Sequence, residues 1–372
     1  MSVAADFLCL LIADDLTGAC DAAAPFAARG RRTVISLTAE HAGQARPVDA
    51  EVLAITTESR RLSVGSLPAV YRGVAERLAG YAPAILFKKI DSTLRGHAGA
   101  EISLAAGAFG RECVIVTSAF PAMGRTVQGG TLRVAGDGFS PVPLIPYWRA
   151  QGLRDAVHAR AGELARALQS GCRFISLDAS SDEDLDAIAA AGLAAGRRIL
   201  WAGSAGLATA LARTRALGPP AALPARERSA VLFCIGSNHT ATTEQKRQLL
   251  AARQVAAACA DTASPGLAEE TLRGGRHFLM DIPCASTPAE RIRELIGRWT
   301  GPLVLSGGDT ASLVCRALDA RAIRLQGEIR PGIARGVMDG GLFDGAPVAT
   351  KSGAFGRPDA LIQILDELTC LK

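Results

Sequence analysis

The chain of 372 residues exceeds one ordinary hydrophobic core and suits two domains. Its apolar share of 49% allows large cores, whereas an aromatic share of only 5% argues against the stacking platforms that hold single-stranded nucleic acid. The formal net charge of +5 is scattered without runs of like charge. It therefore does not indicate a DNA-binding arm, but it is compatible with small anionic partners.

Cysteine usage and hydropathy predict the compartment. The nine cysteines include no Cys-x-x-Cys pair and mostly lie in apolar runs, so we expect buried, reduced thiols. No signal-peptide pattern precedes the first predicted strand, and no apolar run reaches the roughly 20 residues of a membrane helix. The sequence predicts a cytoplasmic protein without membrane contact.

The first half alternates short apolar runs with helical patterns. Runs that are apolar throughout are typical of strands buried on both faces. The predicted strands are 8–13, 33–37, 52–56, 85–90, 114–118, 174–177 and 199–202, with helical patterns such as 66–78 and 97–108 between them. Region 124–146 is rich in glycine and proline, and we expect a long loop with short hairpin strands there. The alternation predicts a mostly parallel sheet with helices on both faces.

A proline-rich stretch, 217–228, divides the chain. Such stretches are typical of linkers, so we predict domains 1–217 and 229–372 with a linker at about 218–228. The second half again alternates, from a strand at 230–235 to a helix near 358–368. The predicted fold is α/β, with two domains that each hold a mostly parallel sheet flanked by helices and an active site in the cleft between them.

An acidic pair stands at the end of the first predicted strand. Asp14 and Asp15 directly follow an apolar run, and ligands of open α/β sheets bind where strands end. Two adjacent carboxylates are costly to bury unless they face hydroxyls, a metal or a reacting proton. The alternative is that one of them caps the next helix and the other is solvated.

A second polar cluster ends the fourth predicted strand. Lys89, Asp91, Ser92 and Arg95 lie within seven residues, and strand alternation puts Lys89 and Asp91 on one face. Arginine binds carboxylates in bidentate fashion and lysine acts as a point charge. The set therefore suits a small acid that bears hydroxyls. Arg125, after the fifth strand, is either a second cation for this acid or a plain loop residue.

Glycine-rich turns in the second half are candidates for holding phosphate. Ser237 lies in a Gly-Ser turn before a helical run, and Gly307, Gly308, Asp309 and Thr310 lie between a strand and a helix. Free N–H groups at a helix start bind anions, and glycine lets the backbone approach them closely. Asp309 is a candidate Mg²⁺ ligand. For the Ser237 turn, helix capping alone is the alternative.

Other patterns narrow the chemistry. Gly345, Lys351 and Ser352 nearly complete a P-loop, but they lie inside a predicted strand with no helix after it, so we reject that match. Lys351 either reaches a phosphate or sits at the edge of a core. The chain has no Gly-x-Gly-x-x-Gly fingerprint, which disfavours a dinucleotide-dependent dehydrogenase, and its five dispersed histidines argue against a His or Cys metal centre.

Taken together, the motifs resemble the four-carbon acid sugar kinase family, which includes kinases for threonate, erythronate and 3-oxo-tetronate. The resemblance covers nearly the whole chain and rests on four fragments in this order: Asp14-Asp15-Leu16-Thr17-Gly18-Ala19, Lys89-Ile90-Asp91-Ser92-Thr93-Leu94-Arg95-Gly96, Ser306-Gly307-Gly308-Asp309-Thr310 and Lys351-Ser352-Gly353-Ala354-Phe355-Gly356. It implies an N-terminal sugar-acid-binding domain and a C-terminal nucleotide-binding domain. The implied reaction is ATP-dependent phosphorylation of a terminal hydroxyl, usually on C4.

The resemblance also implies two sets of site residues. The acid would contact Asp14, Asp15, Lys89, Asp91 and Arg95, to which we add Ser92 and Arg125 from the residue pattern. The nucleotide would contact Ser237, Gly307, Gly308, Asp309, Thr310 and Gly353. The pair Asn238-His239 departs from the family pattern and puts the adenine or ribose contacts in doubt.

Phosphoryl transfer depends on in-line positioning and charge neutralisation. We expect Lys89 and Arg95 to hold the carboxylate or the transferred phosphoryl, and Asp14 or Asp15 to orient the hydroxyl and accept its proton. ATP would lie on the Gly307-Gly308 turn with Mg²⁺ near Asp309, and domain closure would exclude water. The alternatives are a non-catalytic sugar-acid sensor and a dehydrogenase acting on the same acids. The expected partners are the acid and ATP, and a second copy in a homodimer, with no nucleic acid or membrane.

Overall fold

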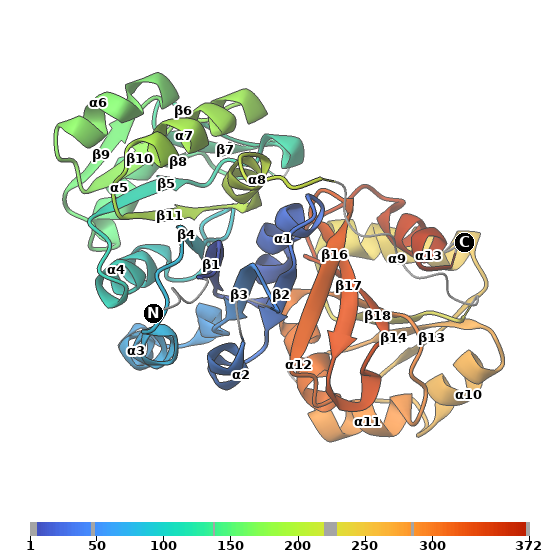
Figure 1. The fold of residues 1–372 in the computed structure, drawn as a ribbon. Coiled ribbons are helices and arrows are strands. Elements are labelled where there is room, and N and C mark those ends of the chain that lie inside the picture. Colours follow the sequence, from blue (N-terminus) through green and yellow to red (C-terminus); the bar gives the residue numbers. More distant parts are fainter. Residues whose placement is uncertain (1–5, 46–48, 137, 219–228, 284–285, 370–372) are drawn as a thin grey trace.

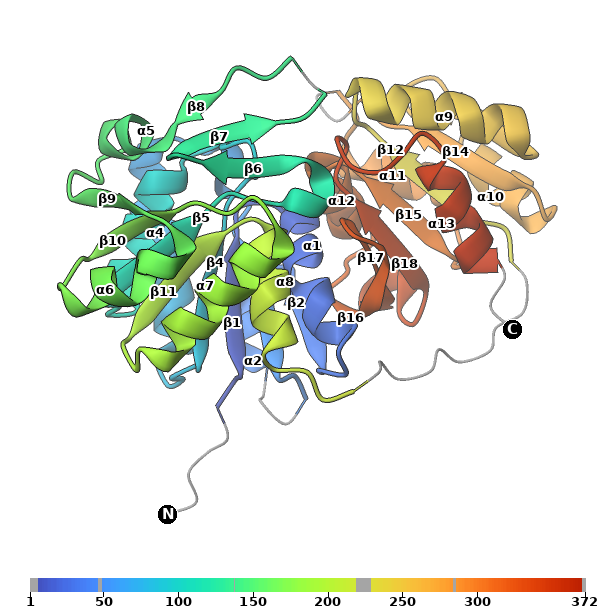
Figure 2. The same cartoon turned by 90° about the horizontal axis from the view of Figure 1, so that it is seen from above.

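A computed structural model describes residues 6–45, 49–136, 138–218, 229–283 and 286–369. Within these residues a 15-stranded sheet runs through the whole molecule in the order β13-β14-β12-β15-β18-β17-β16-β2-β3-β1-β4-β11-β5-β10-β9. An N-terminal lobe in blue and green lies beside a C-terminal lobe in orange and red, and helices flank the sheet (Figure 1, Figure 2). The protein is thus an α/β protein with a mixed, mostly parallel sheet.

The N-terminal lobe contains parallel strands that the apolar runs predict to within one residue at each end, apart from β9, which they miss. These strands are β1 (Cys9–Ala13), β2 (Thr33–Ser36), β3 (Val52–Thr56), β4 (Ile85–Lys89), β5 (Cys113–Thr117), β9 (Ala156–Ala159), β10 (Phe174–Leu177) and β11 (Ile199–Gly203). The helices between them are α1 (Leu16–Ala27), α2 (Ala39–Gln44), α3 (Leu67–Leu78), α4 (Ala98–Ala108), α5 (Leu144–Ala150), α6 (Leu164–Gln169), α7 (Asp182–Ala194) and α8 (Ala205–Arg213). The predicted hairpin strands form a separate antiparallel sheet of β6 (Arg125–Gln128), β7 (Thr131–Val134) and β8 (Val142–Pro143).

The C-terminal lobe combines parallel strands with an antiparallel ribbon. The parallel strands are β12 (Leu232–Ile235), β13 (Val255–Cys259), β14 (His277–Asp281), β15 (Leu303–Ser306) and β18 (Pro347–Lys351). The ribbon pairs β16 (Ala322–Arg330) with β17 (Ile333–Asp339), which in turn pairs with β18. The helices are α9 (Thr240–Ala252), α10 (Leu267–Arg273), α11 (Ala289–Ile296), α12 (Gly308–Ala317) and α13 (Ala360–Thr369).

The two lobes share the sheet, which the sequence did not predict. Strand β16 pairs antiparallel with β2, with Ile323 opposite Ile35 and Leu325 opposite Thr33. The expectation of one sheet per domain is therefore wrong, because the strands of both lobes form a single sheet that is joined at β2 and β16. Of the predicted linker at about 218–228, residues 219–228 lie outside the described residues.

Sheet twist explains how the strand ends of the two lobes meet. In a flat sheet the parallel strands of the two lobes would run in opposite directions, because β2–β16, β16–β17 and β17–β18 are all antiparallel. Neighbouring strands rotate by about 20–25° on average, so the six steps from β1 to β15 add about 120–150°. The accumulated twist turns the carboxyl ends of β1 and β15 toward the same side of the molecule.

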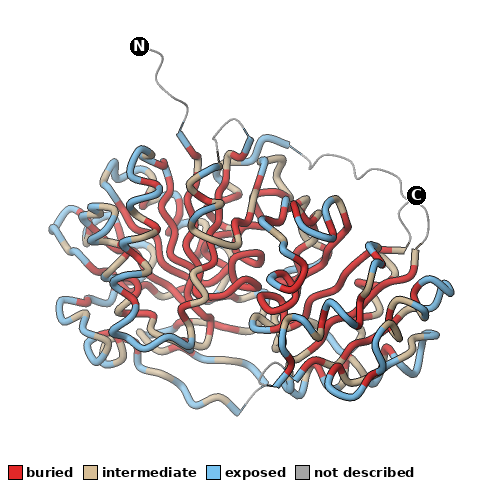
Figure 3. The backbone as a smooth tube through the Cα atoms, turned by 90° about the horizontal axis from the view of Figure 1, so that it is seen from below, coloured by how far each residue is buried: buried red, intermediate tan, exposed pale blue. Residues whose placement is uncertain are grey.

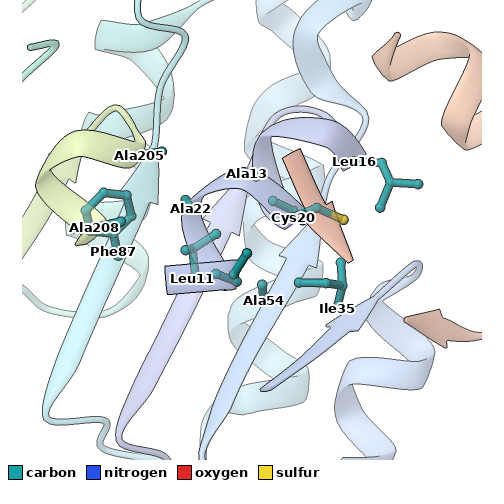
Figure 4. Packing of buried hydrophobic residues seen from close by; sticks show 14 of the residues in the cluster. Leu11, Ala13, Leu16, Cys20, Ala22, Ile35, Ala54, Phe87, Ala205 and Ala208 are labelled. Carbon is teal, nitrogen blue, oxygen red and sulfur yellow. The ribbon is translucent and has the colours of Figure 1, made fainter. Parts of the chain in front are cut away.

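Helix α1 lies at the seam between the lobes, and every one of its residues is buried. Strand β1 is likewise buried and apolar throughout, and buried backbone runs through the interior of both lobes (Figure 3). Small side chains such as Ala22 of α1 and Ala208 of α8 belong to the same buried cluster as Leu11 and Phe87 (Figure 4). The described cysteines are free, and Cys20 is among the buried ones, as expected. No helix in the described residues is long and apolar enough to cross a membrane.

Candidate active site

Two adjoining hollows lie between the lobes. The large hollow, of about 510 Å³, is lined from the N-terminal lobe by Asp15, Thr17, Arg60, Arg61 and Arg95, and from the C-terminal lobe by residues that include Ser237, Gly307, Gly308, Asp309, Thr310 and Gly353. The small hollow, of about 20 Å³, is lined by Asp15, Thr17, Gly18, Asp21, Arg60, Lys89, Asp91, Ser92, Ser352 and Phe355. Both hollows share Asp15, Thr17, Arg60 and Ser352. Residues from both predicted sets therefore meet at one place.

Asp15 links the two hollows and also begins helix α1. Its Oδ1 accepts hydrogen bonds from Gly18 N at 2.7 Å and from the Thr17 hydroxyl at 2.8 Å, and its Oδ2 pairs with Arg60. The helix-capping alternative for the acidic pair is thus correct for Asp15, because an aspartate at this position satisfies a free N–H group of the first turn.

Asp14 is buried and lines neither hollow, so it is not the solvated partner that this alternative expected. Its two oxygens accept from Arg60 Nε at 2.7 Å and Arg60 Nη2 at 3.0 Å. Burial alone would raise the pKa of Asp14, but the nearby cations Lys88 and Arg60 lower it below the usual value. Asp14 is therefore a charged group that fixes Arg60.

Arg60 is a central site residue that the sequence reasoning missed. It lies in a short 3₁₀ turn, Ser59–Arg61, after β3, and the preceding Glu58 has a left-handed φ of 50°. Its guanidinium contacts Asp14, Asp15 and Asp91. Burial alone would lower the pKa of Arg60, but these carboxylates have the larger effect, so the pKa lies above its usual value. The available signal was a polar run, 57–61, that directly follows a predicted strand.

Some residues of the polar cluster at the end of β4 stabilise the fold, and others line the small hollow. Buried Lys88 pairs with Glu101 at 2.9 Å, while Lys89 lines the small hollow and donates to Ile90 O at 2.9 Å. Asp91 accepts from Thr93 N at 2.9 Å and from Arg95 Nη2 at 2.6 Å, so it holds the turn in place. Burial would raise the pKa of Asp91, but these hydrogen bonds and the adjacent guanidinium groups lower it.

The three remaining residues of the predicted acid site lie in three different places. Ser92 lines the small hollow, and Arg95 lines the large one. Arg125 lines neither hollow: its guanidinium carbon lies 5.3 Å from the ring centroid of Phe355, which does line the small hollow. The structure therefore places Arg125 behind the site, where it supports an aromatic wall.

All the predicted nucleotide residues line the large hollow. Helix α12 begins at Gly308, and Gly307 before it has a φ of 102° and no side chain to cap the first turn. A Cβ on Gly308 would lie 3.1 Å from Asp15 Oδ1, and a Cβ on Gly353 would collide with the Ser237 hydroxyl. Glycine is thus required where two loops of the C-terminal lobe touch, at Gly353, and it allows a close approach of Gly308 to Asp15.

Arg61 joins the two walls of the large hollow, because it forms an ion pair with Asp309 across the lobes. His239 caps α9 by accepting from Ala241 N at 3.2 Å.

Lys351 does not reach the hollow. Its ammonium group donates to the carbonyls of Ser352 and Phe355 at 2.9 and 3.0 Å, and burial lowers its pKa to about 7. The core-edge alternative for Lys351 is therefore the correct one.

The donor set of the large hollow suits Mg²⁺ better than a transition metal. Among the described residues no group of three or more His, Cys, Asp or Glu side chains could hold a metal ion. Mg²⁺ usually binds one or two carboxylates and completes its shell with water and substrate phosphates. Asp15 and Asp309, which line the same hollow from opposite lobes, fit that requirement.

Carboxylates and cations line one side of the large hollow, and a glycine-rich helix start lines the other. This arrangement is typical of the active site of a small-molecule phosphotransferase. The family models agree with this class. A sugar-binding N-terminal domain matches residues 9–146 and 140–211, and a nucleotide-binding C-terminal domain matches residues 284–361.

Individual relatives identify the family. The chain is 35% identical to a D-threonate kinase of Bordetella bronchiseptica, with 95% of each chain covered, and 28% identical to a D-erythronate kinase of Heliobacterium modesticaldum, with 96% of each covered. A crystal structure of a Bordetella bronchiseptica protein with bound citrate, a domain-swapped dimer, is 34% identical and covers 98% of this chain and 99% of its own, with a TM-score of 0.50. The chain belongs to the four-carbon acid sugar kinase family.

Proposed function

We propose that the chain transfers the γ-phosphoryl group of ATP to the terminal C4 hydroxyl of a four-carbon sugar acid such as threonate, erythronate or 3-oxo-tetronate. The observation that carries this proposal is the continuity of the two hollows at Asp15. An acid in the N-terminal lobe would thereby present its hydroxyl to a nucleotide in the C-terminal lobe. In-line approach of this kind is the main requirement of phosphoryl transfer.

The acid-binding half of the proposal uses charge and hydroxyl contacts. Arg95 and Lys89 supply positive charge for the carboxylate or the transferred phosphoryl, and Arg60 holds the carboxylates of Asp15 and Asp91 in fixed positions. Fixed carboxylates accept hydrogen bonds from sugar hydroxyls, while the guanidinium groups attract the acid end. The site therefore favours a short acid with several hydroxyls over a neutral sugar.

The nucleotide half of the proposal rests on the start of α12. The N–H groups at a helix start attract phosphate through the helix dipole, and Gly307 and Gly308 add no side chains of their own at that start. Asp15 and Asp309 would hold Mg²⁺, which neutralises phosphate charge when bound. Ser237 and Gly353 would flank the same phosphates.

We also propose the division into an acid-binding domain, 1–217, and a nucleotide-binding domain, 229–372, with a homodimer as the assembly. The domain-swapped dimer of the Bordetella bronchiseptica relative supports an oligomer. Closure of the lobes would keep water from competing for the γ-phosphoryl group. Because β2 and β16 are paired, closure would have to occur by further twisting of the shared sheet.

An ADP-release assay with Mg·ATP tests the function. It should cover D- and L-threonate, D- and L-erythronate and the 3-oxo-tetronates. Turnover on one acid would establish the reaction, and mass spectrometry or NMR of the product would identify the phosphorylated carbon. Arg95→Gln should raise the KM for the acid about 10- to 100-fold, because a charge-assisted hydrogen bond is lost. Arg149→Gln, on the exposed end of α5, is the matched control.

The outcomes separate the possibilities. Binding of both the acid and ATP without any ADP release would support the sensor alternative. Turnover on larger hydroxy acids alone would keep the kinase but refute the four-carbon substrate.

A further inference from the structure

One buried carboxyl group beside the acid site has an oxygen without a hydrogen-bond donor. Asp21 lies in the middle of α1 and is only 4% exposed. Its Oδ1 has no hydrogen-bond partner among the described residues. Leaving a buried acceptor unsatisfied is costly to folding, so such an atom in a native protein calls for an explanation.

The position of Asp21 supplies one. Residues three and four apart on a helix share a face, and accordingly Thr17, Gly18 and Asp21 all line the small hollow. Lys89 also lines the small hollow, and its ammonium group lies close to Gly18: a Cβ added to Gly18 would be 3.5 Å from Lys89 Nζ. The volume of about 20 Å³ is enough for one water-sized group. A single hydroxyl of the acid therefore fits between Asp21 and the large hollow.

The other acidic residues are already engaged. Both oxygens of Asp14 accept from Arg60, and Asp14 lines neither hollow. Asp15 accepts from Thr17 and Gly18 and pairs with Arg60. Hydrogen bonds to a carboxylate favour its charged form and so weaken it as a base. The unsatisfied Asp21 oxygen has no such competition.

The charged groups around Asp21 come from several elements. Burial is the main effect and raises the pKa of Asp21 to about 7; Lys89 and Arg125 oppose the rise, while Asp15 and Asp91 add to it. Glu328 of β16 is also a neighbour, and burial together with Asp21 raises its pKa to about 7. A general base works best when its pKa lies near the working pH.

We propose that Asp21 is the base that accepts the proton of the attacking hydroxyl, an assignment that rests on the proposed function. The hydroxyl oxygen forms a bond to the γ-phosphorus of ATP as its O–H bond breaks and the proton passes to Asp21 Oδ1. The bond between the γ-phosphorus and the bridging oxygen breaks, and ADP leaves. Lys89 lines the same hollow as the reacting hydroxyl.

Steady-state kinetics of Asp21→Asn test this assignment on the acid that the wild type uses best. Loss of a general base typically costs 10²- to 10⁴-fold, so we expect kcat to fall at least 100-fold while the KM values for acid and ATP stay within about threefold. Wild-type kcat/KM should fall as the pH drops below about 7, since protonated Asp21 cannot accept a proton. Asp21→Glu should restore part of kcat and shift this acid limb.

Glu328→Gln is the matched control, because Glu328 titrates in the same range but lines neither hollow. It should keep kcat and retain an acid limb, moved to lower pH because a neighbouring negative charge is removed. Asp21→Asn should also melt at a higher temperature than the wild type at pH 8, since it removes a buried charge, which guards against a folding artefact. An Asp21→Asn enzyme within fivefold of wild-type kcat, or with an unchanged acid limb, would overturn the assignment. A wild type that is silent on every acid would overturn the proposed function as well.

Discussion

Arg60 gives the most direct test of how the site is held together. It stands among Asp14, Asp15 and Asp91, whose residues are only 2%, 6% and 6% exposed. The variant Arg60→Met keeps most of the apolar stem but removes the guanidinium group. Removing one partner of a buried ion pair costs about 3–5 kcal/mol, because the remaining charge is left uncompensated. The Arg60 side chain is 23% exposed, so water reaches part of the vacated place and we expect a loss of about 2–4 kcal/mol.

The loss should depend on pH with a definite sign. In the wild type the folded-state pKa values of Asp14 and Asp91 are lowered. Their contribution to stability is therefore full above the unfolded pKa of about 4 and is lost as the pH falls through the folded values. Without Arg60 the carboxyl groups can accept protons and relieve the repulsion. The difference between wild type and Arg60→Met should thus be largest at pH 7–8 and shrink toward pH 4 and below.

Urea denaturation at pH 8, 6 and 4 measures this difference. Arg61→Met is the matched control, because Arg61 and its partner Asp309 have side chains that are 73% and 48% exposed. An exposed pair contributes about 0–1 kcal/mol, so this variant should unfold nearly like the wild type. Equal losses for the two variants, or a loss for Arg60→Met that does not change with pH, would refute the reasoning.

Three further predictions concern other parts of the site. Glu101→Gln should destabilise the fold by about 3–5 kcal/mol in urea denaturation, because it removes the carboxylate that pairs directly with the buried Lys88 ammonium group; a loss below about 1 kcal/mol would contradict this. Lys351→Met should weaken ATP binding at least about tenfold in calorimetry, because it frees the carbonyls of a loop whose Ser352 and Gly353 line the large hollow; an unchanged ATP affinity would contradict this. Gly308→Ala should raise the KM for ATP more than the KM for the acid, because Gly308 lines only the large hollow and the new Cβ would add bulk at the start of α12; equal effects on both KM values would argue against it.

The sequence predicted most of the sheet because its strands are buried on both faces and are therefore mostly apolar, as in β1 throughout and in β3 up to Thr56. It also predicted the residues at strand ends, since polar side chains that follow an apolar run directly stand out. Lys351 was less clear, because a lysine that donates to three carbonyls of its own loop and a lysine that binds phosphate have the same sequence pattern.

The features that escaped prediction depend on tertiary contacts. Arg60 belongs to none of the sequence motifs, and only the fold brings it to Asp14 and Asp91. Asp21 sits among alanines in a helix that looks like plain core. The pairing of β2 with β16 joins residues almost 300 positions apart, and no local pattern marks either strand as a partner of the other.

The β2–β16 pairing has a consequence for anyone who wishes to produce the lobes separately. A fragment that ends before the C-terminal lobe would expose the backbone N–H and C=O groups of β2, together with the apolar surface of α1 that β16 and α12 cover. An open strand edge of this kind pairs readily with other chains and promotes aggregation. Each fragment would therefore be expected to precipitate or self-associate, whereas co-expression of the two fragments offers each the edge that it lacks.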